Sequence, residues 1–373
     1  MNSGKTRQPR TWPTMVVGLC VAWLAGPGVA VGEAPSTCSA TYAVTRDPSA
    51  DAPALLGWRY LSHRDWSAEL ETANACIEAR GGALDYGARA ELHLASRDFA
   101  RADVDATRRI AMADSAGAHY DRARIRAAAG RHAEAVTDFQ QALRRERTDA
   151  GVIHMHLSIV LSAAGRHDEA ITQARAAVSA DVLEANRVLA QAFRLQGNLA
   201  GEIEAWTQHL ARFLYDRNAY AARSVARSHL EQYADALTDA ARAEDAPDAA
   251  AARALALRGL GRHAEAAAIY VAMAEAQPDN PVGSHGLCFA LTPLNRPAEA
   301  LDQCDRAIAL HATGEHGTPA AAYRGRGDAL VALGRTPEAA QAYRASADTP
   351  GASRLTVQRA EAALARLAAS TTD

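Results

Sequence analysis

The sequence has few aromatic residues and almost no lysine, and these shortages limit what it can be. Aromatic residues make up 5% of the 373 residues and hydrophobic residues 49%, so we expect a core of small side chains. No lysine follows Lys5, and the formal net charge is -3. Because a nucleic-acid-binding surface normally needs a basic excess, we expect no nucleic acid among the partners.

Sequence motifs of catalysis and of metal binding are also lacking. There is no Gly-x-Ser-x-Gly, no phosphate-binding Gly-x-x-x-x-Gly-Lys and no His-Glu-x-x-His zinc motif. His154 and His156 are two residues apart and would point about 200° apart on a helix. His311, Glu315 and His316 could hold a cation, but we interpret them as part of a solvated surface loop at residues 311–317. The sequence therefore predicts no catalytic residue, no metal site and no cofactor.

The longest apolar run lies near the N-terminus and is too short to cross a membrane. Residues 15–25 follow the basic residues Lys5, Arg7 and Arg10, and a span needs about 20 residues. Small residues up to Ala30 complete the pattern of a secretory signal peptide. We therefore predict a signal peptide at residues 1–30 and an exported protein. We expect it in a bacterial periplasm, without stable membrane insertion after cleavage.

A six-residue motif recurs along the rest of the chain. Gly130-Arg131-His132-Ala133-Glu134-Ala135 returns almost unchanged from Gly165 and from Gly261. Weaker copies begin at Arg64, Arg97, Gly197, Glu231, Asn295 and Gly334. The copies lie about 34 residues apart, which indicates a repeat architecture. In the copy at Gly130 we expect helices at residues 120–129 and 133–145, on either side of the turn.

These features resemble the tetratricopeptide repeat, a family of helical hairpins. In the last clear copy the aromatic, small, large, Gly, Ala and aromatic positions of the family are occupied by Tyr323, Gly327, Leu330, Gly334, Ala339 and Tyr343. The resemblance implies an all-α superhelical solenoid of about nine hairpins. The array would cover residues 49–348, between a linker at 31–48 and a C-terminal capping helix and tail at 349–373. Glu69 and Glu202 replace the expected Ala, so we expect the first and fifth hairpins to be irregular.

Four cysteines remain after the predicted signal peptide, an even number that permits two disulfides in an exported protein. Cys288 lies seven residues before the turn at Asn295 and Cys304 nine after it, so the two can face each other across the hairpin. We predict a disulfide there; two packed thiols are the alternative, since free Cys behaves as a small hydrophobe. Cys38 and Cys76 would then pair by elimination.

The resemblance implies a function as well as a fold. In this family the first helices of the hairpins line a concave groove, which implies a non-catalytic scaffold for a protein or peptide partner. The positions expected to face the groove are Tyr120, Arg124, Met155, Ile159, Arg187, Gln191, Arg194, Val225, Arg258, His285, Phe289 and Arg324. Arginines beside apolar side chains are suited to a peptide with acidic groups or a free C-terminus. Arginine is also the chain's only common cation, so composition explains these residues equally well.

Two other functions stay open. The protein could be an envelope-assembly or secretion accessory that acts by self-association, as a homo-oligomer, or by bridging several partners. It could also be a solenoid with glycan-binding or enzymatic activity, which would need acidic residues paired across adjacent repeats.

Overall fold

The computed structural model describes residues 65–146, 150–312 and 318–370. The predicted signal peptide at 1–30, the linker at 31–48 and most of the loop at 311–317 lie outside the described residues. None of the described helices has the length and hydropathy needed to span a bilayer.

The described residues form 18 α-helices and no strand. After α2 (Ser67–Ala79), eight antiparallel hairpins follow in chain order. They are α3 (Ala83–Ala95) with α4 (Phe99–Met112), α5 (Ala116–Ala128) with α6 (His132–Arg145), α7 (Gly151–Ala163) with α8 (His167–Ser179), α9 (Ala185–Gln196) with α10 (Leu199–Arg212), α11 (Arg217–His229) with α12 (Tyr233–Ala243), α13 (Ala249–Gly259) with α14 (His263–Ala276), α15 (Pro281–Ala290) with α16 (Pro297–His311), and α17 (Ala320–Ala332) with α18 (Thr336–Asp348). A short 3-10 turn, η2 (Thr292–Leu294), joins α15 to α16.

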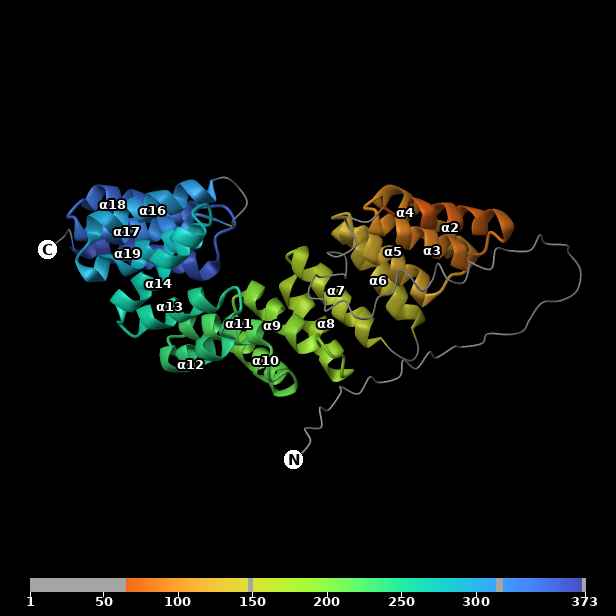
Figure 1. The fold of residues 1–373 in the computed structure, drawn as a ribbon, viewed down its shortest axis with the longest axis horizontal. Coiled ribbons are helices and arrows are strands. Elements are labelled where there is room, and N and C mark those ends of the chain that lie inside the picture. The colour runs from red at the N-terminus through yellow and green to blue at the C-terminus, as the bar shows by residue number, and fades with distance from the viewer. Residues whose placement is uncertain (1–64, 147–149, 313–317, 371–373) are drawn as a thin grey trace, which may run out of the picture.

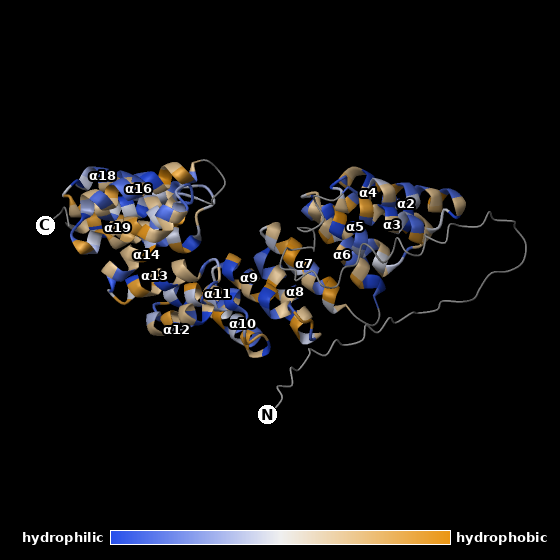
Figure 2. Cartoon of the chain, in the orientation of Figure 1, coloured by the Kyte–Doolittle hydropathy of each residue, from blue (hydrophilic) through white to orange (hydrophobic). Residues whose placement is uncertain are grey.

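Each hairpin packs against the next, and together they form a curved array (Figure 1). Hydrophilic and hydrophobic residues alternate around the helices from one end of the array to the other (Figure 2). The last helix, α19 (Arg354–Ser370), buries Ala363 against α17 and α18 and has no hairpin partner among the described residues. The structure therefore confirms the predicted all-α solenoid with a C-terminal capping helix.

The recurring motif marks the turn inside each hairpin. Its first residue has a positive φ in every described copy, at Gly130, Gly165, Gly197, Gly261 and Gly334 and also at Arg97, Glu231 and Asn295. Glycine adopts this conformation at little steric cost and ends helices for that reason. The three non-glycine residues adopt the same left-handed backbone conformation, which explains why the weaker copies still form turns.

The helix boundaries in the copy at Gly130 differ slightly from the prediction. Helix α5 begins at Ala116 rather than at residue 120, because the Ser115 side chain accepts a hydrogen bond from the backbone N–H of Ala118. Such an N-cap satisfies a donor that the first helical turn leaves unpaired. Helix α6 begins at His132, one residue before the predicted position.

Small residues allow the two helices of a hairpin to approach each other closely. Ala123 of α5 and Ala135 of α6 are both fully buried. Towards the C-terminus glycine serves the same purpose within a hairpin, since a Cβ at Gly327 of α17 would overlap the ring of Tyr343 of α18. Glycine also allows consecutive hairpins to approach, since a Cβ at Gly286 of α15 would overlap the ring of Tyr270 of α14. The core is thus dominated by alanine, as the low aromatic content predicts.

The hairpin α9/α10, the fifth of the predicted repeats, is regular, and the prediction that Glu202 would distort it is wrong. Helices α9 and α10 pack as in the other units, with Glu202 only 2% exposed. Its carboxylate accepts a hydrogen bond from Trp206 Nε1 at 3.4 Å. Burial raises the pKa of Glu202 to about 7, so the site holds a protonated side chain in mildly acidic solution. The first hairpin lies partly outside the described residues, so its regularity stays a prediction.

The hairpin α15/α16 contains the predicted disulfide between Cys288 of α15 and Cys304 of α16. Their Cα atoms are 4.8 Å apart, within the close-approach zone of the hairpin. Cys76 is buried in α2, but Cys38 lies outside the described residues, so the pairing of these two stays a prediction.

Candidate functional site: the inner face of the array

The twelve predicted groove residues lie on the first helices of their hairpins, from α5 to α17. Eleven of them are half-buried and Arg194 is exposed, so none is sealed in the core. We call the surface that they share the inner face. The structure groups some of these residues into two clusters and leaves the others separate.

The first cluster lies on α5 and α7. Tyr120 Oη and His156 Nδ1 are 2.8 Å apart, and the guanidinium of Arg124 lies over the Tyr120 ring at 5.7 Å. Arg124 also forms an ion pair with Glu91 of α3 at 3.1 Å. Burial, followed by the charge of Arg124, lowers the pKa of His156 to about 4. The positive charge of Arg124 is therefore matched by a carboxylate of the chain itself.

The middle of the inner face is more apolar. Met155 and Ile159 of α7 pack against the core, and Val225 of α11 is half-buried. Arg187 of α9 forms an ion pair with Glu184, one helical turn away, at 2.6 Å. Gln191 and Arg194, also on α9, have no charged partner within ion-pairing distance among the described residues.

The second cluster, which we call the Phe289 cluster, comprises Arg258 of α13, His285 and Phe289 of α15, and Arg324 of α17. The guanidinium carbons of Arg258 and Arg324 lie 4.9 and 4.5 Å from the centre of the Phe289 ring. The His285 ring is 5.4 Å from the same ring. Such cation–π contacts are worth about 0.5 to 2 kcal/mol each, the larger values applying where water is excluded.

Burial lowers the pKa of Arg258 and of Arg324, and the charge of Arg359 adds to the effect. Arg324 has one acidic neighbour, Asp328, at 3.3 Å. Burial also raises the pKa of Asp328, which the charge of Arg324 opposes. Sequence reasoning missed both Arg359 and Asp328. The first lies on the capping helix α19, and nothing in the local sequence indicates that this helix reaches the inner face.

A second pattern that was missed holds hairpins together. Arg89, Arg122 and Arg223 donate from Nε and Nη2 to both carboxylate oxygens of Asp105, Asp138 and Asp239, at 2.7 to 2.9 Å. Each pair joins the two helices of one hairpin at a separation of 16 residues. The same residue types at the same distances from three turns were a signal in the sequence.

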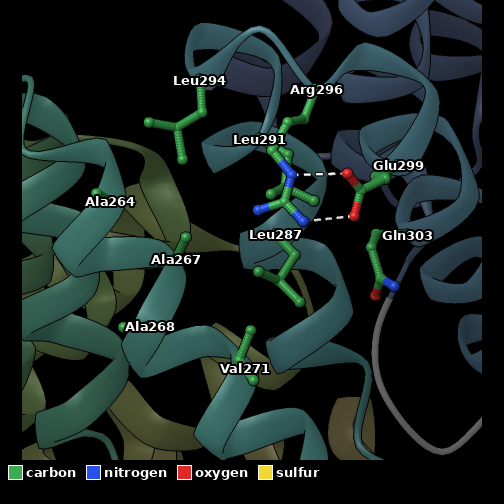
Figure 3. A pocket seen from close by; sticks show the side chains of 10 residues that line it. All are labelled: Ala264, Ala267, Ala268, Val271, Leu287, Leu291, Leu294, Arg296, Glu299 and Gln303. Carbon is green, nitrogen blue, oxygen red and sulfur yellow. Dashed lines mark hydrogen bonds and ion pairs between the residues drawn. The ribbon is translucent and has the colours of Figure 1, made fainter.

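A shallow groove lies outside the inner face, between α14 and α16 (Figure 3). Its volume is about 350 Å³, and it is lined mainly by apolar side chains of α14, α15 and η2. Val271 and Leu287 line the lower part of the groove in Figure 3, and the ion pair of Arg296 with Glu299 lies at its edge. We call this surface the outer groove.

In the described residues no three His, Cys, Asp or Glu side chains are arranged to hold a metal ion. His154 instead contacts Gln173 of α8, with Nδ1 2.7 Å from Oε1. Glu315 and His316 of the inserted loop lie outside the described residues.

No protein-family model matches the sequence, and no curated protein matches it either. Solved structures do resemble it in fold. One is a tetratricopeptide repeat protein from Parabacteroides merdae, with a TM-score of 0.58 and 15% identity, covering 67% of this chain and 99% of that one. Another is the APC/C hetero-tetramer Cut9-Hcn1, with a TM-score of 0.52 and 12% identity, covering 82% of this chain and 66% of that one. With its hairpins, turns and curvature, the chain thus has the tetratricopeptide-repeat fold.

Proposed function

We propose that this protein is a non-catalytic scaffold of the bacterial cell envelope that binds a protein or peptide partner on its inner face. The observation that carries the proposal is the half-burial of eleven groove residues along consecutive first helices. Half-buried side chains have fixed positions and still offer surface to a partner. Extended concave surfaces of this kind are typical binding sites of stacked helical repeats.

Site-specific photo-cross-linking tests this proposal. A photoreactive residue would replace Val225 on the inner face, and in a matched variant it would replace Val104 of α4, which is 69% exposed. Both variants would be expressed with the full N-terminus in the source bacterium, and the envelope would be fractionated before irradiation. We expect a discrete adduct from the position of Val225 and none from that of Val104. Adducts only at Val104, or none at either position, would contradict inner-face binding; an adduct outside the envelope fraction would contradict the location.

The outer groove favours a second candidate, an assembly accessory that acts by self-association. Ala264, Ala268 and Val271 provide an exposed apolar surface there, and Val271 is 42% exposed. Light scattering on wild-type protein and on Val271→Glu separates the two functions. A dimer that Val271→Glu dissociates supports self-association through this groove, whereas a monomer in both cases excludes it.

A further inference from the structure

Three large apolar side chains are exposed on two loops in the middle of the array (Figure 1). Leu183 lies between α8 and α9, and Leu214 and Tyr215 lie between α10 and α11. All three are more than half exposed, and Tyr215, at 92%, is the most exposed large hydrophobic side chain in the described residues. We call these three residues the loop patch. They are separate from the residues of the inner face and of the outer groove.

An ion pair holds the two loops next to each other. Arg212, the last residue of α10, contacts Asp181 of the preceding loop, with 2.6 Å between Nη1 and Oδ1. Leu183 follows Asp181 by two residues, and Leu214 follows Arg212 by two residues. The loop patch is therefore a single surface that two consecutive inter-hairpin loops form together.

The loop between α10 and α11 is fixed by contacts on its inner side. The Phe213 ring stacks on the buried His209 ring, with 4.6 Å between the ring centres. His209 Nε2 is 2.9 Å from Oδ2 of Asp216, whose other carboxylate oxygen caps α11. Leu214 and Tyr215 lie between these two anchored residues and are exposed. Because the loop is already ordered, a partner that binds these side chains loses little free energy in ordering them.

The loops around the patch carry an excess of negative charge. Residues 180–184, 213–216 and 244–248 include six acidic and no basic residues, namely Asp181, Glu184, Asp216, Glu244, Asp245 and Asp248. The arginines that form ion pairs with them, among the described residues, are Arg187, Arg212 and Arg217. Arg217 also joins the third loop to the other two, since it contacts Glu244 at 2.8 Å. Six acidic residues against three arginines leave an excess of three negative charges.

This charge decides which kind of partner is suited to the patch. Exposed apolar and tyrosine side chains with a charged rim are typical of protein interfaces. A second copy that presented the same patch would bring like charges together, and a membrane with anionic lipids would repel the acidic loops. A basic segment is attracted instead, and its Lys or Arg side chains can also lie over the Tyr215 ring.

We propose that the loop patch is a docking surface for a basic segment of a protein partner. Apolar side chains of that segment pack on Leu183, Leu214 and Tyr215, and its Lys or Arg side chains face the surrounding carboxylates. The proposal goes beyond the proposed function, because it assigns a second interaction surface that does not depend on binding at the inner face.

The test measures the binding of fluorescent peptide pools by anisotropy, with the protein expressed from its full-length sequence. The basic–apolar pool combines Lys and Arg with Leu and Phe in random order. The basic–polar pool has Ser and Asn in place of Leu and Phe, and the acidic–apolar pool has Asp and Glu in place of Lys and Arg. All the peptides have blocked ends, so that only their side chains differ in charge.

Two double variants locate the binding site. Leu214→Ser/Tyr215→Ser removes most of the loop patch. Leu84→Ser/Val104→Ser is the matched control, because both of its residues are more than half exposed and lie on the distant hairpin α3/α4. We expect wild type and the control to bind the basic–apolar pool at least about tenfold more tightly than either other pool. Leu214→Ser/Tyr215→Ser should lose about tenfold or more of this affinity.

A third variant tests the charge of the rim. Asp181→Asn/Asp245→Asn replaces two highly exposed carboxylates and should weaken binding of the basic–apolar pool about threefold or more. Added salt should weaken the binding of wild type more than that of this variant. Unchanged affinity in this variant, or tighter binding of the acidic–apolar pool, would overturn the assignment of a basic partner. Equal binding of the two basic pools, no binding of any pool, or equal loss in the patch and control variants would overturn the docking surface.

Further measurements on Leu214→Ser/Tyr215→Ser separate the other occupants. Co-sedimentation of wild type with phosphatidylethanolamine–phosphatidylglycerol vesicles that this variant loses would overturn the proposal in favour of a membrane surface. A wild-type dimer in light scattering that this variant dissociates would overturn it in favour of a second copy. Because both side chains are exposed, the variant should keep the wild-type urea-denaturation midpoint, and a clear loss would show a structural role instead.

The outcome is independent of the cross-linking test at the inner face. An adduct from the position of Val225 without peptide binding at the loop patch would contradict this inference alone. Peptide binding at the loop patch without an adduct from Val225 would contradict the inner-face function alone.

Discussion

Arginines are used differently in the first five hairpins that the structure describes in full, α3 to α12, which we call the first half, and in the last three, α13 to α18, which we call the second half. In the hairpins α3/α4, α5/α6 and α11/α12, an arginine of the first helix is paired with a buried aspartate of the second. At the equivalent positions the last three hairpins lack such pairs; Arg326, for example, reaches across to Asp305 of the preceding hairpin at 2.7 Å. Glycine–tyrosine packing within and between these hairpins and one disulfide stabilise them instead. The same fold can therefore be stabilised without arginine–aspartate pairs inside each hairpin.

Removal of a buried aspartate should have the largest effect on stability. Asp138 is 2% exposed and accepts hydrogen bonds from Arg122 and Arg126. Asp138→Ala leaves Arg122 without its carboxylate and Arg126 with only Asp103, and should reduce the free energy of unfolding by about 3–5 kcal/mol, measured by urea denaturation. The matched control is Asp305→Ala, whose side chain is 52% exposed, with an expected loss of less than about 1 kcal/mol. Equal losses of stability in the two variants would show that the buried ion pairs of the first half stabilise the protein no more than an exposed ion pair does.

Removal of the disulfide should cause the next largest loss of stability, and this loss should be confined to the second half. Cys288→Ala/Cys304→Ala opens a link that spans 16 residues, and a loop of that length is worth about 3 kcal/mol. Hydrogen exchange would locate the change: we expect faster exchange in α15 and α16 and unchanged exchange in α5 and α6. Uniform acceleration along the chain would contradict a local role.

A smaller loss of stability is expected when a glycine that faces a tyrosine ring is replaced by alanine. Gly286→Ala places a methyl group into the ring of Tyr270 and should cost about 1–3 kcal/mol. In the first half Gly117→Ala meets only the end of Arg109, at 3.8 Å, and should leave stability unchanged or slightly higher. Thermal melts of both variants test the difference, and a larger loss for Gly117→Ala would contradict it.

The hairpin α9/α10 should respond to pH through Glu202. Its folded-state pKa of about 7 exceeds the usual 4.5, so the folded state binds a proton more tightly than the unfolded state does. The contribution of this group to stability is thus complete below pH 4.5 and is lost as the pH rises through 7. Glu202→Gln should stabilise the protein more at pH 8 than at pH 5, by about 1–3 kcal/mol.

Urea denaturation at the two pH values measures the effect of this substitution. Glu204→Gln, an exposed position on the same helix, is the control and should show no such difference. If Glu202→Gln behaves in the same way as Glu204→Gln, the carboxyl group of Glu202 does not titrate in this range.

The hairpins, the turns and the disulfide partners could be predicted because they depend on residues close in sequence. Gly130 marks a turn by its backbone preference, and Cys288 and Cys304 lie on the two helices of one hairpin. The individual members of the Phe289 cluster were also expected to face the groove. Their convergence with Arg359 could not be predicted, because it depends on the curvature that accumulates over several repeats. For Glu202 the sequence predicted an irregular hairpin that the structure does not show. The side chain is accommodated because its raised pKa favours the protonated form and because Trp206 donates a hydrogen bond to it.

The central claim is that arginine–aspartate pairs stabilise three hairpins of the first half, whereas the described arginines of the second half form no such pair within their hairpins. Its most direct test compares the urea-denaturation midpoints of Arg122→Gln and Arg258→Gln, in the absence of any ligand. Arg122→Gln leaves the buried Asp138 with less compensation and should lower the midpoint clearly, whereas Arg258→Gln removes only the contact with the Phe289 ring and should lower it much less. A similar loss in both variants would show that Arg258 is a structural residue and would contradict the account.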